Sequence, residues 1–131
     1  MYKTVRGITV VFFFFILWII YLADSGKENI LFQTIRTIPG ADKWGHFGLY
    51  GLLTFLLLIG SRFKTGAVAG IRLSWGVAAV TLFALAEEVS QIFIATRTPD
   101  VLDLAADALG IALAVVLARA TCRCISRPHH G

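Results

Sequence analysis

The sequence contains few charged residues, and this scarcity excludes most soluble folds. Only 15% of the 131 residues are charged, whereas 57% are hydrophobic. In soluble domains about a quarter of the residues are charged and roughly 45–50% are apolar. A chain this short cannot hide so much apolar surface in one core, because small domains have too much surface for their volume. The composition therefore predicts a single domain over residues 1–131 that is solvated by lipid.

Cysteine is almost absent as well, and the two that are present lie close together. Cys122 and Cys124 are too few for a disulfide framework or a complete zinc site. The net charge of +4 would suit nucleic acid, but the basic residues border apolar runs and do not alternate with aromatic residues on one exposed stretch. We therefore expect no nucleic-acid partner, and we take the lipid bilayer as the main partner. The oligomeric state and any cofactor stay open.

Four apolar segments follow one another along the chain, at residues 7–23, 41–61, 71–94 and 100–118. A helix of about 20 residues crosses the hydrocarbon core of a bilayer. The predicted fold class is therefore all-α, a polytopic membrane protein built as a four-transmembrane-helix bundle. Residues 62–70 are expected to form a short loop and residues 30–35 a short interfacial helix. Pro99 is expected to separate the third and fourth helices, because it disfavours helical backbone before it.

The charged residues divide between the two ends of such a bundle. With four spans, the amino terminus, the loop at residues 62–70 and the carboxyl tail share one side, which has no Asp or Glu. Eight of the twelve basic residues lie there: Lys3, Arg6, Arg62, Lys64, Arg72, Arg119, Arg123 and Arg127. The other side has all eight acidic residues and four basic ones: Lys27, Arg36, Lys43 and Arg97. Because positive charge in short loops marks the cytoplasmic face, we predict a multi-pass protein of the cell membrane with both termini cytoplasmic.

Polar residues gather at the outer end of the second predicted helix. Asp42, His46 and Tyr50 are spaced four apart, so they lie along one helical face, and Lys43 reaches the same region. Asp42 also suits a helix amino-terminal cap, and Tyr50 also suits interfacial or core packing. These simpler readings stay open beside the functional one.

The third and fourth helices carry acidic residues at the same level. Glu88 and Gln91 are three apart near the end of the third helix, and we expect the adjacent Glu87 to be solvated or interfacial. A basic residue and an i, i+3, i+7 series open the fourth helix: Arg97, Asp100, Asp103 and Asp107. Asp100 also suits a helix cap. Ionised side chains inside a membrane normally face the bundle interior or a wet cavity. We therefore predict one outward-opening pocket whose basic and acidic residues face each other: Arg97, Lys43 and His46 against Glu88, Asp103 and Asp107.

This mixture of groups suggests acid–base chemistry or ligand binding. The candidate catalytic residues are those that can move protons: His46, Glu88, Asp103 and Asp107. The candidate substrate-binding residues are the other polar members: Asp42, Lys43, Tyr50, Gln91, Arg97 and Asp100. Arg97 and Lys43 would hold a phosphate or carboxylate. A divalent cation would suit the oxygen ligands of Asp103, Asp107 and Glu88.

The sequence leaves open whether the protein is an enzyme. The first alternative is an enzyme that acts on a lipid-linked or cell-wall-related substrate. The second is a non-catalytic protein that binds a lipid or a glycopeptide antibiotic or scaffolds a partner, its buried charges forming a structural salt-bridge network. A proton or ion carrier is less favoured, because residues 55–59 and 110–117 contain no ionisable group.

The chain resembles the VanZ-like family of membrane proteins over residues 41–116. The resemblance lies in three ordered blocks: Asp42-Lys43-x-x-His46-x-x-x-Tyr50, Glu88-x-x-Gln91, and Arg97-x-x-Asp100-x-x-Asp103-x-x-x-Asp107-x-x-Gly110. Family members often carry Asn at the position of Asp107. The family is named for a protein that confers resistance to the glycopeptide teicoplanin, so the resemblance implies a link to the cell envelope. It does not transfer antibiotic resistance to this chain.

Overall fold

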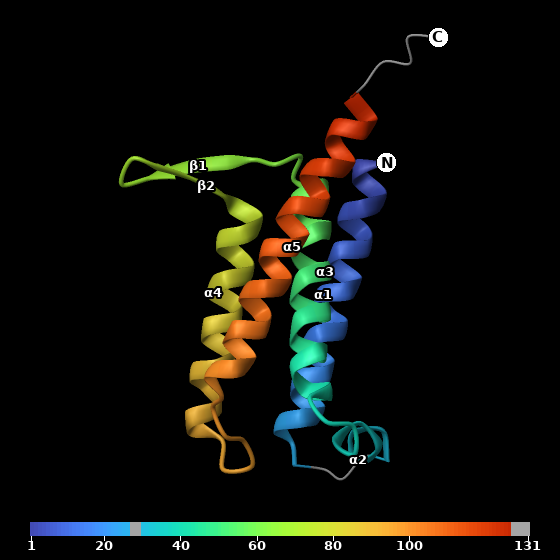
Figure 1. Ribbon diagram of the computed structural model, residues 1–131, viewed down its shortest axis with the longest axis vertical. Coiled ribbons are helices and arrows are strands. Elements are labelled where there is room, and N and C mark those ends of the chain that lie inside the picture. Colours follow the sequence, from blue (N-terminus) through green and yellow to red (C-terminus); the bar gives the residue numbers. More distant parts are fainter. Residues whose placement is uncertain (27–29, 127–131) are drawn as a thin grey trace.

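Four long helices run side by side along the longest axis of the protein in a computed structural model that describes residues 1–26 and 30–126 (Figure 1). They are α1 (Tyr2–Asp24), α3 (Ala41–Gly60), α4 (Trp75–Ser90) and α5 (Val101–Ser126). The short helix α2 (Ile30–Arg36) lies across the end of the bundle where α1 ends and confirms the helix predicted there. Lys27, Glu28 and Arg127, three members of the charge pattern, lie outside the described residues.

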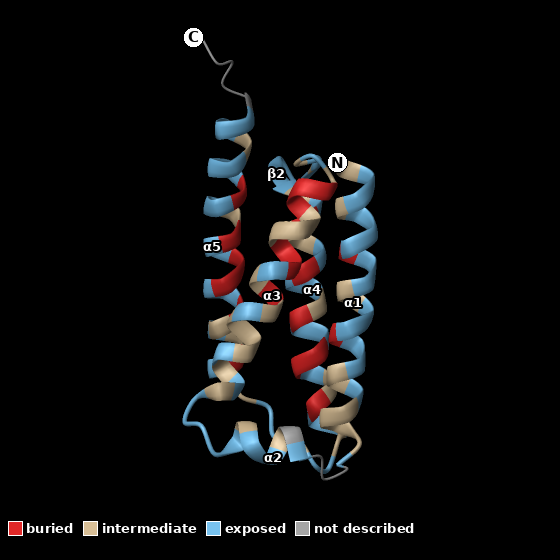
Figure 2. Ribbon diagram, turned by 90° about the vertical axis from the view of Figure 1, so that its right-hand side faces the viewer, coloured by how far each residue is buried: buried red, intermediate tan, exposed pale blue. Residues whose placement is uncertain are grey.

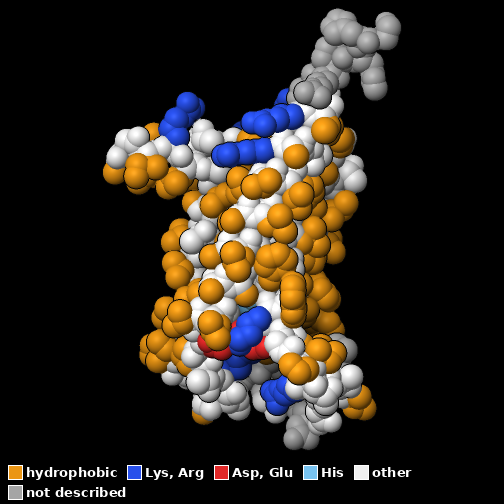
Figure 3. All heavy atoms as spheres, viewed as in Figure 1, with side chains coloured by type: hydrophobic (Ala, Val, Ile, Leu, Met, Phe, Trp, Pro, Cys, Tyr) orange, Lys and Arg blue, Asp and Glu red, His pale blue; other side chains and the backbone are white. Residues whose placement is uncertain are grey.

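Among the described residues, three helical stretches are long and apolar enough to cross a membrane. They are Tyr2–Asp24, Trp75–Phe93 and Val101–Ile125; the second of these includes the 3-10 turn η1 (Gln91–Phe93). The 20-residue α3 is more polar, because its first two turns carry Asp42, Lys43 and His46. Hydrophobic side chains cover the flank of the bundle between its two ends (Figure 3). The protein is therefore a mostly helical membrane protein.

The core runs along the inside of the bundle, where buried residues lie on the sides of the helices that face one another (Figure 2). All four long helices contribute to its larger cluster: Ile16, Tyr50, Leu53, Val80, Ala84 and Ile111. A smaller cluster lies nearer the chain termini and contains Leu58, Ile59 and Ala118. The larger cluster includes Tyr50, so the apolar core reaches the level at which the polar residues begin.

Helices α3 and α5 approach each other at two glycines. A Cβ atom on Gly110 would overlap the backbone carbonyl oxygen of Phe47, and one on Gly51 would lie 3.0 Å from the carbonyl oxygen of Gly110. Small residues allow such close backbone approach in membrane helices. For Gly110 the neighbour is thus another helix of the same chain, a point that sequence alone left open. This contact sets how the first turns of α3 meet the first turns of α5.

The prediction of an all-α chain with a helix from residue 71 is wrong at one place. Residues of the predicted loop and the first four of the predicted helix form an antiparallel hairpin, β1 (Thr65–Val68) and β2 (Ile71–Ser74). Its two-residue turn has positive φ at both positions, 51° at Ala69 and 80° at Gly70. That backbone matches the type I′ turn, whose twist suits a hairpin. The third helix therefore starts at Trp75.

Two other predicted boundaries are also wrong, and in both cases the observed helix is longer than the predicted one. The first helix starts at Tyr2, five residues earlier than expected, and α3 agrees with residues 41–61 to within one residue. The last helix extends to Ser126 and not only to residue 118. Pro99 lies in the non-helical connection between η1 and α5, as predicted. The last helix thus continues into the charged tail, beyond the apolar run from which its end was predicted.

The two ends of the bundle differ in charge. On the face shown in Figure 3, Lys and Arg side chains appear at the hairpin end without acidic ones, whereas basic and acidic side chains appear together at the α2 end. At the hairpin end, Arg6 Nε donates a hydrogen bond to the Gly60 carbonyl at 2.8 Å. The Arg62 guanidinium lies 4.8 Å from the centre of the Tyr2 ring. The start of α1 is therefore held against the end of α3 by basic side chains.

Candidate functional site

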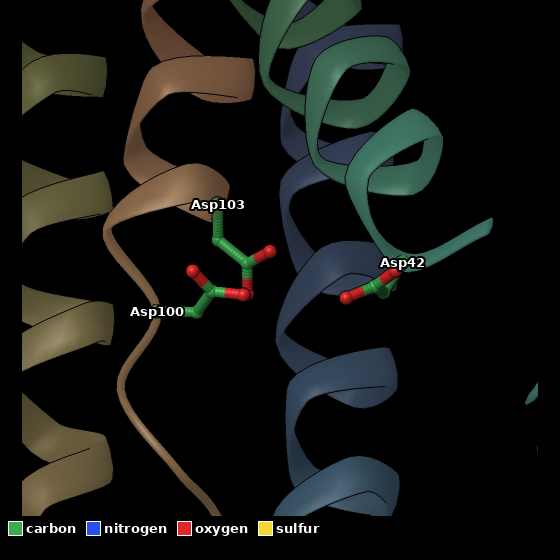
Figure 4. A group of neighbouring side chains, drawn as sticks. All are labelled: Asp42, Asp100 and Asp103. Atoms are coloured by element: carbon green, nitrogen blue, oxygen red, sulfur yellow. The ribbon is translucent and has the colours of Figure 1, made fainter. Parts of the chain in front are cut away.

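The Lys43 ammonium lies among three carboxylates from two segments of the chain. Its Nζ atom is 2.7 Å from Asp42 Oδ2, 2.7 Å from Asp100 Oδ2 and 3.1 Å from Asp103 Oδ1. Figure 4 shows these three side chains around one space, Asp42 from the start of α3, Asp103 from the first turn of α5 and Asp100 from the residue just before that helix. The carboxylates therefore share one cation, and that cation ties α3 to α5.

The same three carboxylates have the spacing of a cation site. One oxygen of each lies within 4.8 Å of the others, which suits a hard divalent cation. The set differs from the predicted one, which joined Asp103 to Asp107 and Glu88. Lys43 places one positive charge among these three carboxylates.

Asp100 pairs with Lys43 and also contacts the start of α5. Its Oδ1 accepts a hydrogen bond from the Leu102 backbone N–H at 2.8 Å, so the reading of Asp100 as a helix cap is confirmed. The hydrogen bond from Lys43, followed by the one from Leu102, lowers the pKa of the Asp100 carboxyl below its ordinary value. Asp42 does not act as a cap, because Gly40 holds that position of α3.

His46 lies between two aspartates of α5. Its Nδ1 is 2.9 Å from Asp107 Oδ1, and its Nε2 is 3.6 Å from Asp103 Oδ2. Its ring stacks on Tyr50, with centroids 5.7 Å apart and planes 6° apart. A carboxylate accepts hydrogen bonds, so Nδ1–H donates to Asp107, and in the neutral ring the lone pair is on Nε2, the nitrogen beside Asp103. The arrangement orients an imidazole for proton transfer.

Glu87 is part of the site, and its prediction as a solvated charge is wrong. Only 7% of the residue is exposed. Its Oε2 accepts a hydrogen bond from the Tyr50 hydroxyl at 3.2 Å, and its Oε1 accepts one from Gln91 Nε2 at 2.8 Å. Arg97 Nη2 lies 3.7 Å from the same Oε1. The spacing of four between Glu87 and Gln91 was a signal for this contact, but the adjacent Glu88 fitted nearly as well.

Glu88 has a different neighbour from the one predicted. It accepts a hydrogen bond from the backbone N–H of Asp100, so it links the end of α4 to the start of α5. It is buried, and among the described residues no Lys, Arg or His lies within ion-pair distance of it. The predicted meeting of Glu88 with Arg97 and Lys43 therefore does not occur.

Arg97 faces Glu87 and an aspartate that sequence reasoning missed. Its Nη1 lies 3.7 Å from Asp24 Oδ1 at the end of α1, and Thr96 Oγ1 donates a hydrogen bond to the Asp24 carbonyl at 3.2 Å. The only signal for Asp24 was its place directly after the first apolar run. Both contacts of the guanidinium exceed hydrogen-bond distance, and its side chain is 21% exposed. Arg97 thus has donors available for a ligand.

One of three comparisons with known proteins gave a match. The family model described as VanZ/LLP1 matches residues 3–123, nearly the whole chain. No curated protein and no solved structure matches. The resemblance drawn from residues 41–116 is therefore confirmed, and the match extends it to α1 and to residue 123 in α5. The chain belongs to the VanZ/LLP1 family.

Proposed function

We propose that all four long helices span the membrane of the cell envelope and that both termini are cytoplasmic. The support is the separation of charge along the sequence together with the course of α3, which runs beside the three apolar helices (Figure 1). Lys43 and His46, in the first turns of α3, contact aspartates of α5, so these two polar side chains face the bundle.

This orientation has a direct test. Cysteines in place of the exposed Thr37 beside α2 and of the exposed Ala67 in the hairpin report the two ends of the bundle. In a background with both native cysteines replaced by serine, a membrane-impermeant maleimide should label position 37 in intact cells and position 67 only after lysis. Labelling of position 67 in intact cells would contradict the proposed orientation.

We further propose that the outer site acts on a lipid-linked or cell-wall-related substrate by acid–base chemistry. The observation that carries this proposal is the oriented imidazole of His46, held by Asp107 and with Nε2 left without a direct hydrogen bond. Such a group takes or gives a proton once a substrate atom or a water lies within hydrogen-bond reach. Its side chain is 15% exposed, so the ring is partly accessible.

Arg97 is the residue proposed to bind an anionic part of that substrate. The N–H donors of its guanidinium make no direct hydrogen bond within the described chain, and the ion-pair partners of this group lie at 3.7 Å. A guanidinium binds phosphate or carboxylate through two parallel hydrogen bonds. Lys43 differs, since three carboxylates already surround it. We therefore assign substrate binding to Arg97 and a structural role to Lys43.

The experiment that tests catalysis compares envelope lipids by mass spectrometry in cells with and without the protein. A catalyst should produce a lipid-linked species of changed mass that disappears with the protein. Unchanged lipids, with a lipid that copurifies with the protein, would instead favour the second candidate function, a non-catalytic binder. The pairing of Lys43 with three carboxylates favours that candidate, because such a network ties helices together without any reaction.

A further inference from the structure

An apolar hollow of about 500 Å³ lies between α4 and α5. Its volume is within the range of small-molecule sites. Its walls are mainly hydrophobic and come from both helices: Val77, Thr81 and Leu85 from α4, and Leu104, Ala108 and Ala112 from α5. The hollow follows two helices that are long and apolar enough to cross a membrane, so hydrocarbon would surround it in a bilayer.

One polar residue of the site, Asp107, also lines this hollow. Its Oδ1 is taken by His46 Nδ1. Only 2% of the residue is exposed, and its buried Oδ2 has no hydrogen-bond partner within the described chain. A buried acceptor without a partner is costly, and such groups in native proteins call for a partner. An occupant of the hollow that carries a hydrogen-bond donor would supply it when the Asp107 carboxylate turns towards the hollow that the residue lines.

The charge of the site also selects the kind of head group. Seven acidic residues lie at this end of the described chain, against Lys43, Arg97, Arg36 and the imidazole of His46. The surroundings of Asp107 contain further carboxylates, Asp103 being on the other side of the same imidazole. A hydroxyl or an ammonium is therefore favoured next to Asp107, whereas a carboxylate there would be repelled.

We propose that the hollow between α4 and α5 binds the hydrocarbon chain of a membrane lipid whose polar end donates a hydrogen bond to Asp107. This inference rests on the proposed function and adds to it the substrate class and the route of entry. The chain of the lipid lies between the two helices, and its hydroxyl- or amine-bearing end reaches the carboxylate that orients His46. The reacting end of a lipid is thereby delivered from within the bilayer.

The test uses photo-crosslinking with the full-length protein in phosphatidylcholine nanodiscs. One probe is a monoacylglycerol with a diazirine in the middle of its chain, which has hydroxyl donors. The matched probe is the methyl ester of the same diazirine fatty acid, which has none. We expect the monoacylglycerol to label residues of α4 and α5 that line the hollow, with a yield about tenfold above that of the methyl ester, since only the first satisfies the buried acceptor.

Substitutions inside and outside the hollow should distinguish lipid bound in the hollow from lipid at the surrounding surface of the protein. Ala112→Phe, or Ala108→Phe as a second variant, fills the hollow and should lower the yield of the monoacylglycerol about tenfold. Ala120→Phe makes the same change on an exposed part of α5 that does not line the hollow, and its yield should equal that of the unchanged protein. Asp107→Leu should make the two probes equal. Labelling spread evenly over lipid-facing residues such as Phe14 on α1, or unaffected by the filling variants, would overturn the proposal.

The test distinguishes failure of this binding proposal from failure of the proposed function. Labelling confined to the hollow, together with unchanged envelope lipids, would leave this binding site in place and remove the catalytic proposal. A lipid modified by the protein, together with labelling outside the hollow, would do the reverse.

Discussion

Gly110→Ala should destabilise the bundle more than any other single-methyl change on α5. The added Cβ would overlap the backbone carbonyl oxygen of Phe47, so a helix backbone and not the end of a flexible side chain must move. Overpacking of a close contact typically costs about 1–3 kcal/mol, and we expect this variant at or above the upper part of that range. Separation of α3 from α5 would also move Lys43 and His46 away from their aspartates.

The measurement is the apparent midpoint of thermal unfolding in detergent micelles, followed by size-exclusion chromatography of heated samples. The midpoint of Gly110→Ala should fall by about 5 °C or more. Gly51→Ala should fall less, because its Cβ would be 3.0 Å from the Gly110 carbonyl oxygen. Gly48→Ala is the matched control on α3, since a Cβ there meets nothing within 4 Å. Equal midpoints for Gly48→Ala and Gly110→Ala would show that the close approach does not limit stability.

The helices could be predicted from the sequence because apolar side chains dominate them. The predicted apolar segments matched α1 to within five residues and α3 to within one residue at each end, and the break at Pro99 was also correct. The hairpin could not be predicted, because it depends on positive φ at Ala69, a residue with no intrinsic preference for that conformation. Its strands are short, and apolar residues such as Ile71 and Leu73 fit a membrane helix equally well by composition.

The membership of the site could be predicted better than its pairings. Spacing along α3 and α5 placed His46 beside Asp103 and Asp107, as the structure has them. Spacing alone does not fix the rotation of α4, and a rotation of 100° per residue separates Glu87 from Glu88. The structure turns Glu87 towards Tyr50 and leaves Glu88 to the backbone of the next helix. The pairing of side chains between helices could therefore be determined only from the structure.

The pairings separate structural charges from reactive ones. A buried ion pair often contributes little net stability, but the loss of one partner leaves a costly uncompensated charge. Lys43 is surrounded by carboxylates at hydrogen-bond distance, which is the pattern of a fixed structural cation. Arg97 and the Nε2 of His46 have no direct hydrogen bond of this kind. The groups left without close partners are those that a substrate can still engage.

His46→Ala should lower the rate of the proposed reaction about 10²–10⁴-fold, the usual contribution of a general acid or base. The reason is that Nε2 is the proton acceptor left free once Nδ1–H donates to Asp107. The rate is measured as formation of the lipid species of changed mass, with purified protein and extracted envelope lipids. Trp44→Ala is the control, an alanine substitution two residues earlier on α3 at a side chain that is 71% exposed.

Two further readouts separate a chemical role of His46 from a structural one. Imidazole added to His46→Ala should restore part of the rate, because the deleted ring leaves space beside Asp107 for a free base, and a purely structural defect would not respond. Asp107→Asn should lower the rate less than His46→Ala, because an amide oxygen still accepts the hydrogen bond from Nδ1–H and keeps the same ring nitrogen free. If His46→Ala retained the full rate while folding normally, proton transfer by this imidazole would be excluded, and the cluster would be left with binding or structural roles.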